Sequence, residues 1–237
     1  MRRDIKLGYP TLKKNPQNQY LRDPFIETPF FRYLESPHHS SLLRDGSILV
    51  GTLYKYKDTL DQQRVDSDEG IGIIRQSYNH FKDDVPQDFR DTFGIGPGPM
   101  IGATFINNKS IYISPNCLIM SLSAKKNDPK LLEKFGTNCV EITDIFGFAS
   151  EITQSLIDQA SSNVRDPIIY PIIYDTRTQY YSASKQTHPA WVKTPDYQEE
   201  AEVRLLWEIV GQPTLSEHYI IENQNISNYV KLVSGSD

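Results

Sequence analysis

The sequence predicts a single α+β domain built mainly on antiparallel strands with a few short helices. Three observations predict this class. Candidate strands outnumber candidate helices, and the two do not alternate regularly as they would in a doubly wound parallel sheet. The chain has 237 residues, enough to bury a core without disulfides. Prolines interrupt every periodic pattern before residue 30, so we expect an irregular arm over 1–29 and the domain over 30–237.

The domain is expected to begin with a strand, a helix and a second strand. Residues 30–34 are aromatic and read as a strand. A capping serine, a proline at the first helical position and a glycine stop predict a helix over 37–44. An apolar run then predicts a strand over 47–53.

Turn residues and periodicity predict the rest of the chain. We expect loops over 58–70, 80–100 and 191–197, and a hairpin over 104–114 that turns on its Asn-Asn pair. Further helices are predicted over 129–135, by an Asp-Pro start and a glycine stop, and over 144–160, by apolar residues at three- and four-residue spacing. Further strands are predicted over 71–79, 117–123, 138–143, 168–174, 203–210, 216–221 and 229–233.

Composition argues against several classes of protein. Twenty-five Lys+Arg against 30 Asp+Glu give a net charge of −5, so a strongly basic nucleic-acid binder is not expected. No apolar run is long enough to cross a membrane, and the N-terminus lacks the apolar stretch of a signal peptide. The two cysteines, Cys117 and Cys139, do not make a disulfide scaffold. We therefore expect a cytoplasmic protein with no membrane partner, and the oligomeric state stays open.

Common metal, phosphate and nucleophile motifs do not fit the chain. The five histidines lack the spacing of a zinc site, so no metal is expected. Prolines interrupt the glycines at 94–98, which indicate a turn rather than a phosphate-binding loop. No nucleophile elbow occurs, and both cysteines lie in apolar strand patterns where a thiol is usually inert.

The densest group of chemically active side chains lies at 197–207. A polar loop leads there into an apolar strand, and strand alternation would place Glu200, Glu202 and Arg204 on one face. Crowded carboxylates raise each other's pKa, and Arg204 would offset that effect. Such a face either lines a cleft or is an ordinary exposed face with a cross-strand ion pair.

The pair Glu200-x-Glu202 resembles the glutamate motif of ADP-ribosyltransferases. Arg32 on an early strand and Ser121-x-Ser123 on a mid-chain strand precede it, in the order of the arginine–serine–glutamate branch of that family. A leucine stands between the serines where the branch usually has threonine. The resemblance implies a split sheet of the ADP-ribosyltransferase type.

The chain also resembles, over about residues 30–210, an uncharacterised family of bacterial and phage-associated proteins. The shared pattern is an early strand–helix–glycine–strand unit, the loop at 66–70, a Cys-x-x-x-Ser strand and a late Glu-x-Glu-x-Arg strand. This resemblance suggests a toxin or a phage-defence protein acting in conflict between phage and bacterium.

The resemblance to ADP-ribosyltransferases implies NAD as substrate and assigns catalytic roles to two carboxylates. Breaking the bond between nicotinamide and ribose builds positive charge on the ribose, as in glycoside hydrolysis. Glu202 would stabilise that charge, and Glu200 would orient or deprotonate the acceptor.

The remaining residues of the expected site would bind NAD. Arg32 would hold a phosphate or the ribose, because a planar guanidinium suits phosphate oxygens. Ser121 would hydrogen-bond the ribose and brace the glutamate, with Ser123 beside it. Tyr54 or Tyr56, at the end of the second strand, would stack on the nicotinamide ring.

Three functions remain open from the sequence. The first is an NAD-dependent ADP-ribosyltransferase that modifies a protein or nucleic acid. The second is an NAD glycohydrolase or other nucleotide-processing enzyme. The third is a non-catalytic nucleotide-binding or inhibitor protein on the same fold, because a fold does not guarantee its chemistry.

Overall fold

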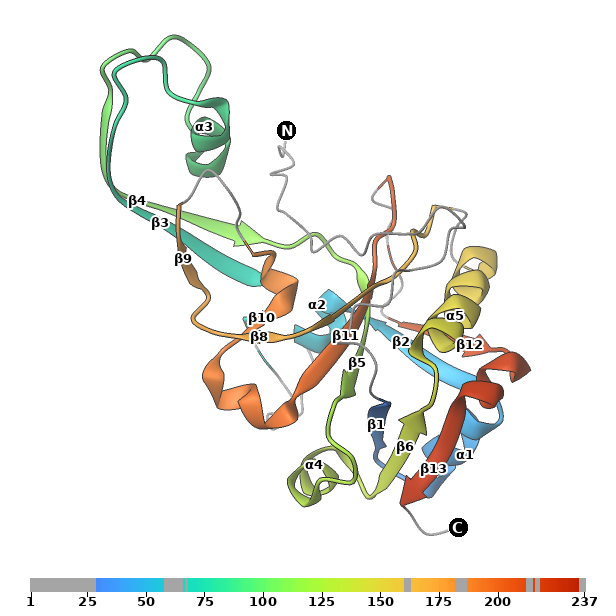
Figure 1. Ribbon diagram of the computed structural model, residues 1–237. Coiled ribbons are helices and arrows are strands. Elements are labelled where there is room, and N and C mark those ends of the chain that lie inside the picture. The colour runs from blue at the N-terminus through green and yellow to red at the C-terminus, as the bar shows by residue number, and fades with distance from the viewer. Residues whose placement is uncertain are drawn as a thin grey trace. The chain divides into compact units, whose positions relative to one another are not determined.

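The computed structural model describes residues 29–57, 66, 68–159, 163–181, 187–211, 215 and 218–234 (Figure 1). Except for its last residue, the expected arm lies outside these residues, as does most of the expected loop over 58–70. The described chain is α+β, and its strands pair mainly antiparallel, as predicted.

The contacts of the chain divide it into two compact units. We call 70–115 together with 173–195 the hairpin unit, and the other described residues the main unit. This division is finer than the single domain expected from the sequence, and each unit is described by itself.

The main unit holds an eight-stranded antiparallel sheet in the order β12-β2-β5-β1-β6-β13, with β11 pairing both β5 and β7. Most of its strands lie within one or two residues of their predicted positions. The strands are β1 (Phe30–Leu34), β2 (Ser47–Thr52), β5 (Leu118–Ser123), β6 (Asn138–Ile142), β7 (Ile168–Pro171), β11 (Glu202–Trp207), β12 (His218–Glu222) and β13 (Val230–Ser234).

Two helices of the main unit begin at the predicted caps. Ser36 accepts a hydrogen bond from the His39 N–H and starts α1 (Pro37–Arg44). Asp128 accepts from two backbone N–H groups and starts α4 (Pro129–Phe135). The other helices of this unit are α2 (Leu53–Lys57), α5 (Ile145–Gln159), and the 3-10 helices η3 (Pro195–Glu200) and η4 (Gln224–Tyr229).

The core lies between α5 and one face of the sheet. Phe148, Ile152 and Leu156 of α5 are fully buried in one cluster with the apolar residues of β5 and β11. Each such side chain contributes about 1.5–3 kcal/mol by leaving water. The indole N–H of Trp207 donates to Thr153 Oγ1 at 2.8 Å, which fixes α5 against β11. No helix in the described part of the chain is long and apolar enough to span a membrane.

The hairpin unit is built on a long antiparallel pair. β3 (Ile71–His80) pairs antiparallel with β4 (Thr104–Ile113) and parallel with the short strand β9 (Thr178–Tyr180). The other elements of this unit are α3 (Gln87–Phe93), the 3-10 helix η2 (Pro189–Trp191), and the parallel pair β8 (Ile173–Tyr174) and β10 (Val192–Lys193).

Two predictions for the hairpin unit are wrong. The region 80–100 is not only loop, because it contains α3, whose Phe89 is buried against the rings of Phe81, Phe105 and Tyr181. The polar local sequence predicts a loop, but packing of the Phe89 ring stabilises a helix here. The region 104–114 is not a hairpin either: β4 runs through Asn107, which tolerates its positive φ of 54° without reversing the chain.

Two further predictions place elements incorrectly. The expected strand over 168–174 is two strands, β7 and β8, which pair with different partners. The expected loop over 191–197 contains β10 and the start of η3. Proline at 171 and proline at 195 coincide with these breaks, because proline cannot donate to a strand ladder or a helix interior.

Candidate functional site

The central strand β5 positions the predicted site residues. Along one edge it pairs with β11 over its whole length, with Ser121 opposite Arg204 and Ser123 opposite Glu202. Along the other edge β2 pairs with its first residues, and β1 pairs with it only through Phe31 and Ser123. The ladder therefore has a gap beside the middle of β5, between β2 and β1 (Figure 1).

Ser121 and Glu202 are joined by their side chains. Directly opposite residues point to the same face of an antiparallel sheet, so Ser121, Glu202 and Arg204 share the face away from α5. The Ser121 hydroxyl donates to Glu202 Oε1 at 2.5 Å. This short bond to a carboxylate holds the glutamate in one orientation.

Arg204 ties Glu202 to a second carboxylate, that of Glu69. Its Nε and Nη2 donate to Glu202 Oε1 at 2.9 and 2.8 Å, and its Nη1 donates to Glu69 Oε1 at 2.8 Å. The side chains of Arg204, Glu202 and Glu69 are 1%, 3% and 5% exposed. We call these three residues the buried cluster.

The charges of the buried cluster hold Arg204 in its ionised form. Burial opposes the charge of the guanidinium, but Glu202 and Glu69 outweigh it and raise the pKa of Arg204 above its usual value. Charged groups inside a protein persist only when they are paired and hydrogen-bonded in this way.

Cys117 is buried next to the buried cluster. Burial raises the pKa of its thiol to about 12, and the charge of Arg204 only partly opposes that effect. A thiol with this pKa carries negligible thiolate at neutral pH, which agrees with the inert role expected from its apolar strand.

Glu200 does not lie on the strand face predicted for it. It ends η3, and Ala201, whose φ is 42°, turns the chain before β11 begins. The simple alternation of Glu200, Glu202 and Arg204 is therefore wrong. Lys134 of α4 donates to Glu200 Oε1 at 2.7 Å, and its ammonium also lies 5.1 Å from the ring centre of Tyr197.

Arg32 reaches β5 through the main chain. Its Nη1 donates to the backbone oxygen of Ser121 at 3.0 Å, in the gap between β1 and β2. Because Phe31 is opposite Ser123, alternation places Arg32 on the face of β1 opposite to that of Ser123 and Glu202. Arg32 thus touches the same residue as Glu202 does, from the other side of the strand, and uses one of its several N–H donors to do so.

Ser123 has a structural contact where a ligand contact was predicted. Its hydroxyl donates to the Glu200 backbone oxygen at 2.7 Å and accepts from the Lys125 N–H at 3.0 Å. These bonds fix the end of η3 beside the end of β5. Tyr33 braces the following turn, since its hydroxyl donates to the Lys125 backbone oxygen and accepts from the Asp128 N–H, both at 2.8 Å.

Tyr54 and Tyr56, which were expected at the end of the second strand, lie on the helix that follows it. Both lie on α2, where residues two apart face different directions. The Tyr56 ring packs on Gly51, so closely that an added Cβ there would lie 2.7 Å from the ring. Tyr54 is exposed. The structure therefore gives the two tyrosines different surroundings and does not pair them at one site.

Sequence reasoning missed Glu69 and Lys134 as neighbours of the site. Their separations from their partners, 135 and 66 residues, hide both contacts from local pattern reading. The available signal for Glu69 was its place in the loop before Gly70, whose positive φ of 71° marks a fixed turn.

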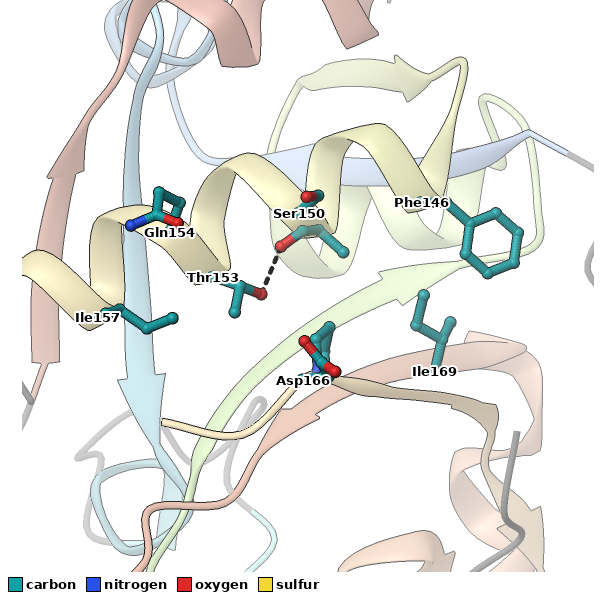
Figure 2. A pocket seen from close by; sticks show the side chains of 9 residues that line it. Phe146, Ser150, Thr153, Gln154, Ile157, Asp166 and Ile169 are labelled. Atoms are coloured by element: carbon teal, nitrogen blue, oxygen red, sulfur yellow. Dashed lines mark hydrogen bonds between the residues drawn. The ribbon is translucent and has the colours of Figure 1, made fainter. Parts of the chain in front are cut away.

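A separate hollow lies on the main unit away from these residues. Figure 2 shows Phe146, Ser150, Thr153, Gln154 and Ile157 of α5 facing Asp166 and Ile169, around a cavity of about 140 Å³. None of the predicted site residues lines it. Its lining mixes apolar side chains with three neutral polar ones and one carboxylate, that of Asp166.

No protein-family model matches the chain, and searches of the curated proteins and of the solved structures return no match.

Proposed function

We propose that the protein is an NAD-dependent ADP-ribosyltransferase with Glu202 as its catalytic carboxylate, on a split sheet of the ADP-ribosyltransferase type. The observation that supports this most is the bond between Ser121 Oγ and Glu202 Oε1, which joins the two predicted motifs across neighbouring strands. Residues 81 positions apart in sequence were predicted to act together, and they share one face of the sheet.

The chemistry asks for a fixed carboxylate. As the nicotinamide–ribose bond breaks, its electron pair leaves with nicotinamide, and positive charge develops on the ribose. A carboxylate that is already oriented stabilises this charge without reorganising at the moment of reaction. Ser121 and Arg204 supply that orientation to Glu202.

The other predicted roles fit less directly. Arg32 would offer its remaining N–H donors to a phosphate at the edge of the gap beside β5. Glu200 would activate an acceptor only after its ion pair with Lys134 opens.

The ion pair between Glu200 and Lys134 favours a second candidate, an NAD glycohydrolase. Hydrolysis needs only water as acceptor, so it does not depend on a second carboxylate that activates a macromolecule. The two candidates share the first step and differ in what attacks the ribose.

The test is incubation of the full chain with NAD labelled in its adenylate part, with and without a cell lysate. We expect nicotinamide release, and Glu202→Gln should slow it by about a hundredfold or more, because the developing charge loses its counter-charge. Glu208→Gln is the matched control: it removes the carboxylate of the residue directly after β11 and should not change the rate.

The products separate the candidates. Label on a protein or nucleic acid supports transfer, and nicotinamide release without labelled macromolecule supports hydrolysis. If the parent releases no nicotinamide, or if Glu202→Gln matches the parent, both enzymatic proposals are wrong. Tight NAD binding without turnover would then indicate the non-catalytic alternative.

A further inference from the structure

The outer strand of the hairpin unit has an open edge. The sheet order is β4-β3-β9, so β4 pairs on one side only, and no strand of the described chain pairs with its other edge. β4 is ten residues long. An edge of this length exposes a row of backbone N–H and C=O groups that another extended chain can pair with.

One face of the same sheet is open to solvent. The register places Arg75 opposite both Lys109 and Tyr180, and Ile73 opposite Ile111, so these side chains share a face. We call this face, which also includes Ile113, the outer face. Ile111, Ile113 and Tyr180 are 60%, 54% and 70% exposed.

The opposite face of the sheet is covered near residues 72–76 of β3. Ile74 and Gln76 are buried, and Gly72 lies so close to Pro189 that an added Cβ would sit 2.8 Å from it. The exposed isoleucines are therefore not part of a core that the hairpin unit completes for itself. Apolar side chains gathered on an exposed face mark an interaction site.

The charges on the outer face are unbalanced. Arg75 and Lys109 lie directly opposite each other, and neither side chain makes an ion pair or hydrogen bond with another described residue. Like charges in directly opposite positions destabilise a sheet. A carboxylate placed beside Lys109 would relieve this repulsion.

A second copy of the chain does not supply that carboxylate by pairing edge to edge. β4 reads Thr-Phe-Ile-Asn-Asn-Lys-Ser-Ile-Tyr-Ile and contains no acidic residue. Antiparallel pairing of two β4 strands would add a second lysine and leave both positive pairs without a counter-charge. Charge complementarity therefore favours a different partner.

We propose that β4 binds an extended acidic–aliphatic segment of a partner protein as an additional strand of the hairpin sheet. Backbone hydrogen bonds to the open edge would hold the segment, and its alternate side chains would lie over the outer face. A Glu or Asp would lie next to Lys109 and Arg75, and aliphatic residues would lie next to Ile111 and Ile113. This site lies within the hairpin unit and does not depend on the proposed enzymatic activity.

Single-stranded nucleic acid fits the outer face less well. Such binding uses several aromatic rings for base stacking and a groove of positive charge along the backbone. The outer face offers one aromatic ring and two cations among aliphatic side chains.

The test uses two short fluorescent peptides and the full chain, with binding measured by fluorescence anisotropy. In the acidic peptide, alternate residues are Val, Val and Glu, ordered to lie next to Ile113, Ile111 and Lys109, with Thr between them. The basic peptide replaces Glu by Lys. We expect the acidic peptide to bind at least about tenfold more tightly than the basic one. Lys109 and Arg75 would attract the Glu of the acidic peptide and repel the Lys of the basic peptide.

The variants locate the site. Lys109→Glu should reverse the preference between the two peptides, whereas Lys82→Glu, an equal charge change off the outer face, should leave it unchanged. Methylating alternate backbone nitrogens of the acidic peptide should abolish binding, because strand addition needs its N–H donors. Urea unfolding of each variant checks that the fold is kept.

Four results of the binding assays would overturn the proposal. These are equal binding of the two peptides, no binding of either, acidic-peptide binding that Lys109→Glu leaves unchanged, and stronger competition by a single-stranded oligonucleotide than by unlabelled acidic peptide. A concentration-dependent dimer that Ile111→Asp dissociates would also overturn it, by assigning the edge to a second copy.

Discussion

Replacing Arg204 by methionine should strongly destabilise the main unit. The side chain is 1% exposed and holds Glu202 and Glu69 through three N–H groups at 2.8–2.9 Å. Methionine fills much of the same volume without charge. The two carboxylates would then lie together in a region of low dielectric without the guanidinium that they share.

The expected loss of unfolding free energy is about 3–5 kcal/mol, the usual cost of removing one partner from a buried ion pair. Most of that cost is the burial of carboxylates that have lost their counter-charge. Replacing Glu69 and Glu202 by glutamine in the Arg204→Met variant should therefore restore a large part of the loss.

Urea unfolding at several pH values measures this effect. In Arg204→Met the carboxylates gain raised pKa values in the folded state. Protonation of these carboxylates then stabilises the folded variant. This stabilisation is complete below their unfolded pKa, near 4, and is lost as the pH rises through the folded value, so the variant should be closest to the parent in stability at low pH. Arg165→Met is the matched control: Arg165 pairs with Glu208 at the surface and should matter little.

A loss below about 1 kcal/mol in Arg204→Met would refute the reasoning, because it would mean that the carboxylates are hydrated or protonated without the guanidinium. An unchanged pH dependence, relative to the parent, would refute it as well.

Three further predictions follow from single contacts. Burial lowers the pKa of His188 from 6.5 to about 4. Between pH 6.5 and pH 4 only the unfolded chain takes up the proton, so the free energy of unfolding of the parent should fall by up to about 3 kcal/mol as the pH is lowered through this range. Urea unfolding checks this, and His188→Gln should not show the loss. Gly136→Ala should lower the melting temperature far more than Gly94→Ala. Both glycines have positive φ, but of the two only Gly136 has backbone nearby, since an added Cβ would lie 2.2 Å from Glu35 Cα. Equal shifts in melting temperature would contradict this prediction. Ser121→Ala should slow nicotinamide release about tenfold with little change in the KM for NAD, because Ser121 orients Glu202, and Ser121→Thr, which keeps the hydroxyl, should recover part of the rate.

Local sequence was sufficient where one segment determines its own structure. The caps at Ser36 and Asp128 and the apolar spacing of α5 predicted three helices, because each signal lies within one turn of the element it defines. The same holds for β1, β2, β5 and β6, which are bounded by turn residues.

Local sequence failed where a distant partner decides. α3 is stabilised by contacts of Phe89 with three rings that lie outside the helix in sequence, those of Phe81, Phe105 and Tyr181. The Asn-Asn pair of β4 has the composition of a turn, yet β3 pairs with residues on both sides of it and keeps the strand continuous. Glu200 does not lie on its predicted strand face because Ala201 has a positive φ, and no pattern of charged residues predicts that conformation.

The buried cluster connects the stability of the main unit with its proposed chemistry. A carboxylate meant only for a surface ion pair gains nothing from burial, since paired charges in the interior barely repay their desolvation. Glu202 is nevertheless buried, and Ser121 and Arg204 hold the same oxygen, Oε1. Three donors therefore converge on one oxygen and fix the position of the carboxylate. A group that must face a developing positive charge without reorganising needs this degree of fixation. On this reasoning Arg204→Lys should keep part of the folding stability, because it keeps the charge. It should still lose nicotinamide release, because an ammonium cannot reproduce the planar contacts of the guanidinium to Oε1. A variant that lost stability and activity in proportion would show instead that the cluster serves the fold alone.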